Sequence, residues 1–305
     1  MHSFGEELFA FANGIELCYQ EMGEPDGEPL VLVMGLATQM IAWDPGFCSL
    51  LADSDFRVIR FDNRDVGRST KIDTAGVPSR IDMLAGRRAT APYLLRDMAR
   101  DTFGLMDHLG IESAHVAGAS MGGMIAQTMA IERPERVRSA VSIMSTTGSR
   151  WVGLPSFRAF SAMLAKPPRN RDEMIQRTIR TFKVIGSPGF AFDEERVRDI
   201  AGRSYDRGHS SAGVARQLHA ILASGDRTRS LRELDLPATV IHGGSDPLIR
   251  PSGGRATAKA IPGARLRIID GMGHDLPREV WPQVAEEIAA TAARARETAG
   301  ATPAI

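Results

Sequence analysis

Short apolar runs recur along the chain, and segments with helical periodicity separate them. The runs are PLVLVMG (29–35), FRVIRFD (56–62), SAHVAGAS (113–120), VRSAVSIM (137–144), PATVIHGG (237–244) and ARLRIIDG (264–271). Strands that alternate with helices in this way are typical of a mainly parallel sheet with helices on both faces. The pattern therefore predicts an α/β fold.

The alternation is interrupted twice. Residues 70–92 are rich in glycine, proline and charge, which predicts a long surface excursion. Residues 148–230 contain two amphipathic patterns, RNRDEMIQRTIRTFKVIG and SSAGVARQLHAILASG, and we interpret them as a helical cap inserted into the sheet domain. Residues 1–147 and 231–293 then form the two parts of the core. The tail at 294–305 loses its apolar periodicity and is expected to be frayed.

Composition narrows the class of protein. At 305 residues and 43% hydrophobic content, the chain can bury a large core. Lys+Arg and Asp+Glu both total 37, so the net charge of zero argues against binding to nucleic acid or to an anionic membrane. No apolar stretch approaches the roughly 20 residues that cross a bilayer. Cys18 and Cys48 form no metal-ligand cluster, and the first residues do not resemble a secretory signal, so we expect a cytoplasmic protein with reduced thiols.

Ser120 stands in the stretch Gly118-Ala119-Ser120-Met121-Gly122, which matches G-x-S-x-G. An apolar strand precedes it and a helix pattern follows, which is the setting of a nucleophile on a strained turn. The glycines on either side then make room for neighbouring backbone. The alternative is a serine that only caps the helix of an ordinary strand–helix unit.

A serine nucleophile needs a base, and the base needs a carboxylate that orients it. In this type of architecture the expected chain order is serine, acid, histidine. Of the seven histidines, His274 follows a predicted strand in a glycine-rich loop downstream of Ser120. Asp246 lies in the turn GGSDPL after another predicted strand, at the same edge of the sheet. A histidine simply bonded in a turn and a solvated turn aspartate are the alternatives.

Acyl transfer also needs hydrogen-bond donors for the developing oxyanion. The motif predicts one donor, the backbone N–H of Met121, directly after the nucleophile. The loop after the first predicted strand can supply the second, because Gly35 lets the backbone approach and Leu36 follows it. Gly35 as an ordinary turn glycine is the alternative.

The segments GASMGG, GGSDPL and GMGHDLP together resemble the nucleophile elbow, acid turn and histidine loop of the α/β-hydrolase superfamily, over residues 29–290. Within it, residues 31–70 look most like bacterial esterases of the aclacinomycin methylesterase type. The resemblance implies an eight-stranded, mostly parallel sheet with a helical cap after the sixth strand. Many relatives carry His-Gly where this chain has Met34-Gly35, a change that should alter packing more than chemistry. In the segment FDNRDVGRS, the resemblance implies structural roles for Asp62, Arg64 and Asp65.

We therefore expect a carboxylic ester hydrolase that acts on a small-molecule ester through an acyl-enzyme and needs no cofactor or metal. Thioesterase, lactonase, perhydrolase or carbon–carbon bond hydrolase activity on the same three residues remains open, as does a ligand-binding protein with slow turnover. Aromatic residues near the predicted site could line an apolar pocket or could simply pack the cap onto the sheet. The pocket candidates are Gly35, Trp43, Trp151, Phe157 and Phe160.

Overall fold

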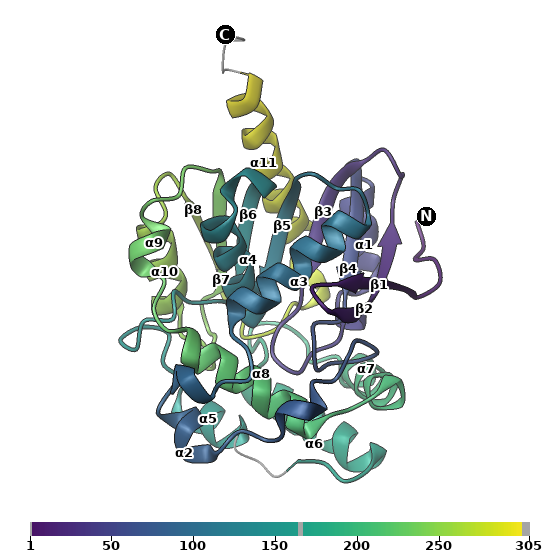
Figure 1. Cartoon of the computed structure of the whole chain (residues 1–305), viewed down its shortest axis with the longest axis vertical. Helices are drawn as coiled ribbons and strands as arrows, with labels where there is room; N and C mark the ends of the chain where they lie inside the picture. Colours follow the sequence, from purple (N-terminus) through teal and green to yellow (C-terminus); the bar gives the residue numbers. More distant parts are fainter. Residues whose placement is uncertain (1, 164–166, 301–305) are drawn as a thin grey trace.

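A computed structural model describes residues 2–163 and 167–300 and contains an eight-stranded sheet with the order β1-β2-β4-β3-β5-β6-β7-β8 (Figure 1). The strands from β3 to β8 run parallel to one another, which confirms the predicted α/β-hydrolase architecture. Their bounds are β1 (Leu8–Ala12), β2 (Ile15–Met22), β3 (Glu28–Val33), β4 (Phe56–Phe61), β5 (Ala114–Ala119), β6 (Val137–Ile143), β7 (Ala238–Gly243) and β8 (Arg265–Ile269).

The β1–β2 hairpin was not among the predicted strands, and it extends one edge of the sheet. β1 and β2 pair antiparallel, and β2 pairs antiparallel with β4. Asn13 and Gly14 form the turn with φ of 49° and 80°. Two successive positive φ angles are what a tight hairpin turn requires, and Asn-Gly is the dipeptide that adopts them most readily. The signal for this hairpin is therefore present in the sequence.

Helices cover both faces of the sheet (Figure 1). On one face lie α3 (Leu95–His108), α4 (Met121–Glu132) and α10 (Pro251–Ala260), whose apolar side chains share one core with the strands. On the other face lie α1 (Pro45–Ala52) and α11 (Trp281–Gly300), which contribute to a second core. This arrangement leaves the carboxyl ends of the parallel strands as the edge where loops can converge. Among the described helices, none combines the length and apolarity needed to span a membrane.

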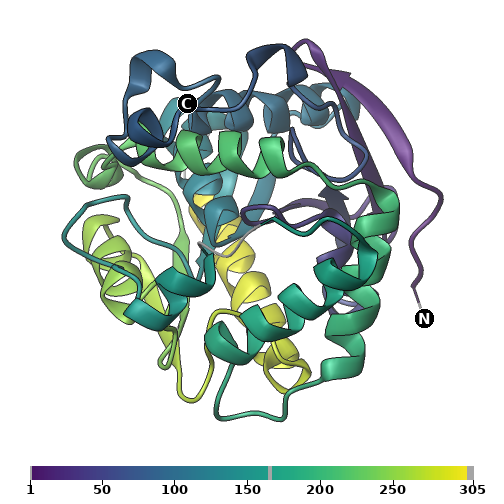
Figure 2. The same ribbon diagram turned by 90° about the horizontal axis from the view of Figure 1, so that it is seen from below.

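Between β6 and β7 the described residues form helices joined by loops, with no strand among them. We call α5 (Phe157–Met163), α6 (Arg171–Ile185), α7 (Glu194–Arg207) and α8 (Ser211–Ser224) the cap helices, because they gather over the carboxyl ends of the strands (Figures 1 and 2). The next helix, α9 (Thr228–Leu231), packs instead against α4 and α10. The predicted cap boundary at residue 230 therefore falls inside a helix that belongs with the sheet.

Residues 70–92 run beside the cap helices. This excursion contains α2 (Arg80–Leu84) and the short 3₁₀ helices η2 (Asp73–Ala75) and η3 (Arg88–Thr90). α2 packs against α8, and Arg216 of α8 donates a hydrogen bond to the carbonyl of Gly76 at 2.9 Å. The remaining 3₁₀ helices are η1 (Met40–Ala42), η4 (Pro134–Arg136) and η5 (Arg278–Val280).

The carboxyl-terminal helix is longer than the sequence predicts. α11 continues to Gly300, so the expectation of a frayed tail from residue 294 is wrong for residues 294–300. Arg294 donates hydrogen bonds to the carbonyl of Ala238 at 2.7 Å and to the hydroxyl of Thr239 at 3.0 Å. Arg296 pairs with Glu28 at 2.8 Å. These polar contacts attach the last turns of α11 to the sheet, although this part of the helix lacks an apolar stripe. Residues 301–305 lie outside the described part of the chain.

Candidate active site

Ser120 sits on a strained turn between β5 and α4. Its φ and ψ are 57° and −117°, a conformation that L-residues with a side chain rarely adopt. A Cβ on Gly118 would come within 2.1 Å of the carbonyl oxygen of Gly122, and one on Gly122 within 2.0 Å of that of Val33. Both glycines are therefore required by close backbone approaches. The turn presents the Ser120 side chain away from the helix end, and its hydroxyl makes no capping hydrogen bond to α4.

The three residues predicted from chain order are in contact. The Nε2 atom of His274 lies 3.0 Å from the Ser120 Oγ, and its Nδ1 atom lies 2.7 Å from Asp246 Oδ2. The three side chains come from the segments that follow β5, β7 and β8, which all end at the same edge of the sheet. With Nδ1–H donating to the carboxylate, Nε2 is free to accept the serine proton. This arrangement favours the nucleophile interpretation over a serine that only caps a helix.

Asp246 is held by backbone amides as well as by His274. Its Oδ1 accepts hydrogen bonds from the N–H groups of Leu248 and Ile249 at 2.8 and 2.9 Å. The residue is 2% exposed, which excludes the alternative of a solvated turn aspartate. Asp275, nearer to His274 in sequence, instead accepts a hydrogen bond from Ser187, and burial raises its pKa.

A second histidine lies beside the acid. His242 is fully buried on β7, and its Nε2 atom is 2.7 Å from the Ile249 carbonyl and 3.6 Å from Asp246 Oδ2. Burial lowers the pKa of His242, so its ring is neutral at physiological pH. A neutral ring adds no cation to compete with His274 for the Asp246 carboxylate. The sequence indicated only that His242 falls within a strand.

The end of α6 and the residues that follow it support the histidine loop. The His274 N–H donates to the carbonyl of Ile185 at 2.7 Å, and the Gly273 N–H donates to the Ser187 hydroxyl at 2.8 Å. A Cβ on Gly273 would come within 2.2 Å of the Gly186 carbonyl oxygen. The cap helices and the histidine loop are therefore in direct contact through backbone groups. Sequence reasoning missed these residues, because nothing in their local pattern marks a partner some 90 residues away.

The predicted oxyanion donors lie next to Ser120. Met121 is the first residue of α4, and N–H groups in the first turn of a helix have no acceptor within the helix. A Cβ on Gly35 would lie 3.1 Å from the Ser120 Cβ, so only a glycine lets the loop after β3 come this close without displacement. We call residues 34–39 the β3 loop. The assignment of the N–H groups of Leu36 and Met121 as oxyanion donors stays a prediction.

The aromatic pocket candidates are scattered. Trp43 is 1% exposed and its ring stacks on Phe47 with 5.7 Å between centroids, within the core that α1 and α11 share. This placement corrects its predicted pocket role, because the indole packs the core. Trp151 and Phe157 are 82% and 85% exposed, and Phe160 is 45% exposed. Their segment runs beside the acid turn, where the Ser156 N–H donates to the Pro247 carbonyl at 2.7 Å, and their pocket role stays a prediction.

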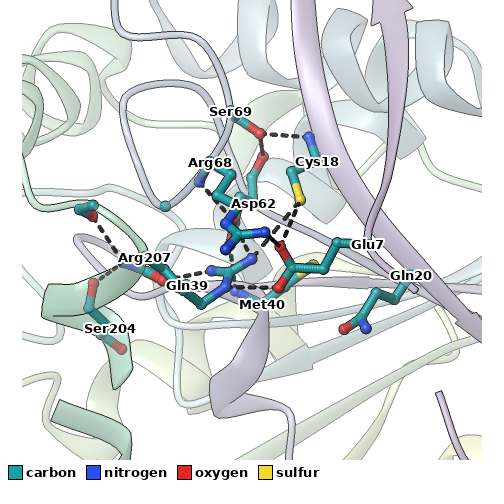
Figure 3. A network of polar contacts seen from close by, with 12 residues as sticks. Glu7, Cys18, Gln20, Gln39, Met40, Asp62, Arg68, Ser69, Ser204 and Arg207 are labelled. Carbon is teal, nitrogen blue, oxygen red and sulfur yellow. Dashed lines mark hydrogen bonds and ion pairs between the residues drawn. The ribbon is translucent and has the colours of Figure 1, made fainter. Parts of the chain in front are cut away.

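Asp62, Arg64 and Asp65 make the bracing contacts expected of structural residues. Arg64 binds Asp101 of α3 through two hydrogen bonds of 2.6 Å. Asp65 accepts two hydrogen bonds from Arg216 of α8, at 2.9 and 2.7 Å. Asp62 is fully buried and pairs with Arg207 of α7 at 2.9 Å (Figure 3).

Comparison with known proteins places this chain in a family. A family model described as the alpha/beta hydrolase fold matches residues 28–277. The chain belongs to the alpha/beta hydrolase fold family. In the described part of this family member, no group of three or more His, Cys, Asp or Glu side chains could hold a metal ion.

Among curated proteins, this hydrolase is 28% identical to rhodomycin D methylesterase DnrP of Streptomyces peucetius, over 90% of this chain and 94% of the relative. It is 27% identical to rhodomycin D methylesterase DauP of Streptomyces sp. (strain C5), with the same coverage. A solved hydrolase from Pseudomonas aeruginosa PA01 superposes with a TM-score of 0.70 at 23% identity, covering 95% of this chain and 98% of that one. This last likeness concerns the fold alone.

Proposed function

We propose that this chain is a serine hydrolase of carboxylic esters in which Ser120 is the nucleophile, His274 the general base and acid, and Asp246 the residue that orients the imidazole. The observation that carries the proposal is the continuous hydrogen-bonded relay from the Ser120 hydroxyl through His274 to Asp246 on a strained turn. Such a relay activates an alcohol that is otherwise a poor nucleophile.

In the first step, Ser120 Oγ attacks the ester carbonyl carbon while His274 Nε2 takes the hydroxyl proton. The protonated imidazole then gives that proton to the leaving alcohol, and an acyl-enzyme remains on Ser120. Water attacks the acyl-enzyme in the second step, with His274 again taking and returning a proton. The Asp246 carboxylate stays ionised throughout and stabilises the imidazolium.

Both tetrahedral intermediates place a negative charge on the former carbonyl oxygen. We assign the N–H groups of Leu36 and Met121 to that oxygen, supported by the position of Met121 at the start of α4 and by the close approach of Gly35 to Ser120. Backbone donors arranged in advance stabilise this charge without reorganising during the reaction.

The curated relatives suggest which esters to test first. Both are methylesterases, and the likeness extends over nearly the whole length of each. We therefore propose methyl esters of carboxylic acids as the substrate class, with methanol as the leaving alcohol. We also propose a cytoplasmic location, supported by two free, buried cysteines.

The test compares wild type with Ser120→Ala on p-nitrophenyl esters from acetate to long chain and on a panel of methyl esters of apolar acids. Hydrolysis that disappears in Ser120→Ala supports the proposal, and comparable hydrolysis in the variant contradicts it. Stoichiometric labelling of Ser120 by a fluorophosphonate without hydrolysis of any ester would retain the nucleophile and discard the ester substrate. Absence of labelling would discard the nucleophile as well.

A further inference from the structure

We infer that Gln217, on cap helix α8, is a positioning residue that holds the β3 loop in the arrangement needed to stabilise the oxyanion. This inference rests on the proposed function and adds a role for a residue that makes its hydrogen bonds to Ala37 and Arg64 and none to Ser120, His274 or Asp246. It joins a cap helix to the loop after β3, across 180 positions of sequence.

Gln217 is fully buried and uses both ends of its amide. Its Oε1 accepts the N–H of Ala37 at 2.9 Å, and its Nε2 donates to the Arg64 carbonyl at 2.8 Å. Ala37 has a φ of 60°, in the left-handed region that residues with a Cβ avoid. A strained conformation of this kind persists only when surrounding contacts enforce it, and the Gln217 amide supplies such a contact.

The strained residue is next to the predicted oxyanion donor. Leu36 precedes Ala37 directly, and Gly35 precedes Leu36 at the point of close approach to Ser120. A change in the Ala37 backbone therefore alters the direction of the neighbouring peptide groups. Since oxyanion donors act only at the right distance and angle, a misplaced Leu36 N–H costs transition-state stabilisation while leaving ester binding intact.

The far end of the β3 loop is fastened to the cap by separate contacts. Gln39 is 4% exposed, and its Nε2 donates to the carbonyls of Ser204 and Gly208 at 2.6 and 2.9 Å (Figure 3). The Met40 N–H donates to Asp62 at 2.8 Å, and Asp62 in turn pairs with Arg207 of α7. With this end held independently, loss of Gln217 should release the loop locally at Ala37 and leave the cap helices in place.

The experiment compares Gln217→Met, which removes both hydrogen bonds at similar side-chain length, with Gln217→Glu. When protonated, the carboxyl of Gln217→Glu can accept from Ala37 N–H and donate to the Arg64 carbonyl, as the amide does. Gln20→Met is the matched control: Gln20 is a buried residue on β2 whose amide donates to the Gly5 carbonyl at 2.8 Å and accepts from Arg60 at 2.7 Å.

For Gln217→Met we expect kcat to fall roughly 10- to 100-fold with KM within about twofold, because an oxyanion donor alone is worth about 10²–10³ in kcat. Inhibition by a trifluoromethyl ketone, which mimics the tetrahedral intermediate, should weaken by a similar factor. Gln217→Glu should keep more of kcat than Gln217→Met. Gln20→Met should lower the melting temperature and leave kcat and inhibition within about twofold of wild type.

The inference is overturned if Gln217→Met changes kcat and ketone inhibition no more than Gln20→Met does, or if KM rises in step with the loss of kcat. The rate of fluorophosphonate labelling of Ser120 keeps the two proposals apart, because its phosphoryl oxygen occupies the position of the oxyanion. If wild type is labelled but hydrolyses no ester, the proposed function is contradicted. Slower labelling of Gln217→Met than of wild type would still support the inference in that case. A wild type that is not labelled overturns both.

Discussion

His274 and Ser120 are 154 positions apart in the chain, yet the imidazole Nε2 and the serine Oγ are 3.0 Å apart. The parallel sheet produces this contact, because β5 and β8 both end at the edge where the loops converge. On the other side of the same ring, Asp246 holds Nδ1 at 2.7 Å. The imidazole is therefore held in one tautomer and one orientation before any substrate binds.

The orienting role of Asp246 can be tested by an isosteric change. Asp246→Asn should lower kcat by roughly 10⁴, because the amide favours the tautomer that cannot accept the serine proton. The measurement is kcat on p-nitrophenyl acetate at neutral pH.

Asp275→Asn is the control for this substitution. Asp275 directly follows His274 in sequence, but its carboxylate accepts a hydrogen bond from Ser187 and not from the imidazole. It should retain kcat within a few-fold. Full activity of Asp246→Asn, or an equal loss in both variants, would show that the acid has been assigned wrongly.

The nucleophile turn should tolerate no side chain at its glycines. Gly122→Ala would place a Cβ 2.0 Å from the carbonyl oxygen of Val33, at the carboxyl end of β3. Such overpacking should lower the unfolding free energy by about 1–3 kcal/mol or more. Urea denaturation of the variant and of wild type measures this difference.

Gly5→Ala is the matched control, because a Cβ at Gly5 meets nothing within 4 Å. Its unfolding free energy should stay within about 0.5 kcal/mol of wild type. If the unfolding free energy of Gly122→Ala also stays within about 0.5 kcal/mol of wild type, α4 does not approach β3 as closely as the structure indicates.

The buried pair of Asp65 and Arg216 should contribute to stability in a pH-dependent way. Burial alone would raise the pKa of Asp65, but hydrogen bonds from Arg216 and Tyr93 outweigh it and hold that pKa below its usual value. Since the unfolded carboxyl binds a proton first, near pH 3.9, this contribution is complete above about pH 4 and is lost as the pH falls through the folded pKa.

Arg216→Met should therefore cost about 3–5 kcal/mol of unfolding free energy at pH 7, because it leaves a buried carboxylate without its cationic partner. The difference from wild type should narrow as the pH falls toward the lowered pKa of Asp65 in the folded wild type, because the buried carboxyl of the variant, without Arg216, takes up a proton at a higher pH. Arg203→Met, which removes an exposed pair with Asp199, is the control and should change stability by less than about 1 kcal/mol. A difference that stays constant with pH would argue against this account.

Both cysteines should resist alkylation in the folded protein. Burial raises the pKa of the Cys18 and Cys48 thiols to about 12, so the reactive thiolate is scarce at pH 8. Iodoacetamide should modify neither residue in the native state and both in urea, as counted by mass spectrometry. Rapid native labelling of Cys48 would show that the core around α1 opens more readily than its burial indicates.

Sequence patterns predicted the parallel strands and the order of Ser120, Asp246 and His274, because each signal lies within a short window. They missed the β1–β2 hairpin although Asn13-Gly14 marks its turn. They also predicted a pocket role for Trp43 that its stacking on Phe47 does not support. An aromatic residue looks the same in sequence whether it lines a pocket or fills a core, since neighbours from distant segments decide between the two.

The sequence by itself determined the local chemistry: a glycine-flanked serine at a strand end, an aspartate in a turn, and a histidine in a glycine-rich loop, in the order that a serine hydrolase uses. Only the tertiary structure decided which groups hold that chemistry in place. Gln217 reaches Ala37, and Ile185 accepts the His274 N–H, through contacts between segments that share no local pattern. Local sequence signals arise from backbone preferences over a few residues. These contacts depend instead on how the cap helices pack over the carboxyl ends of the strands.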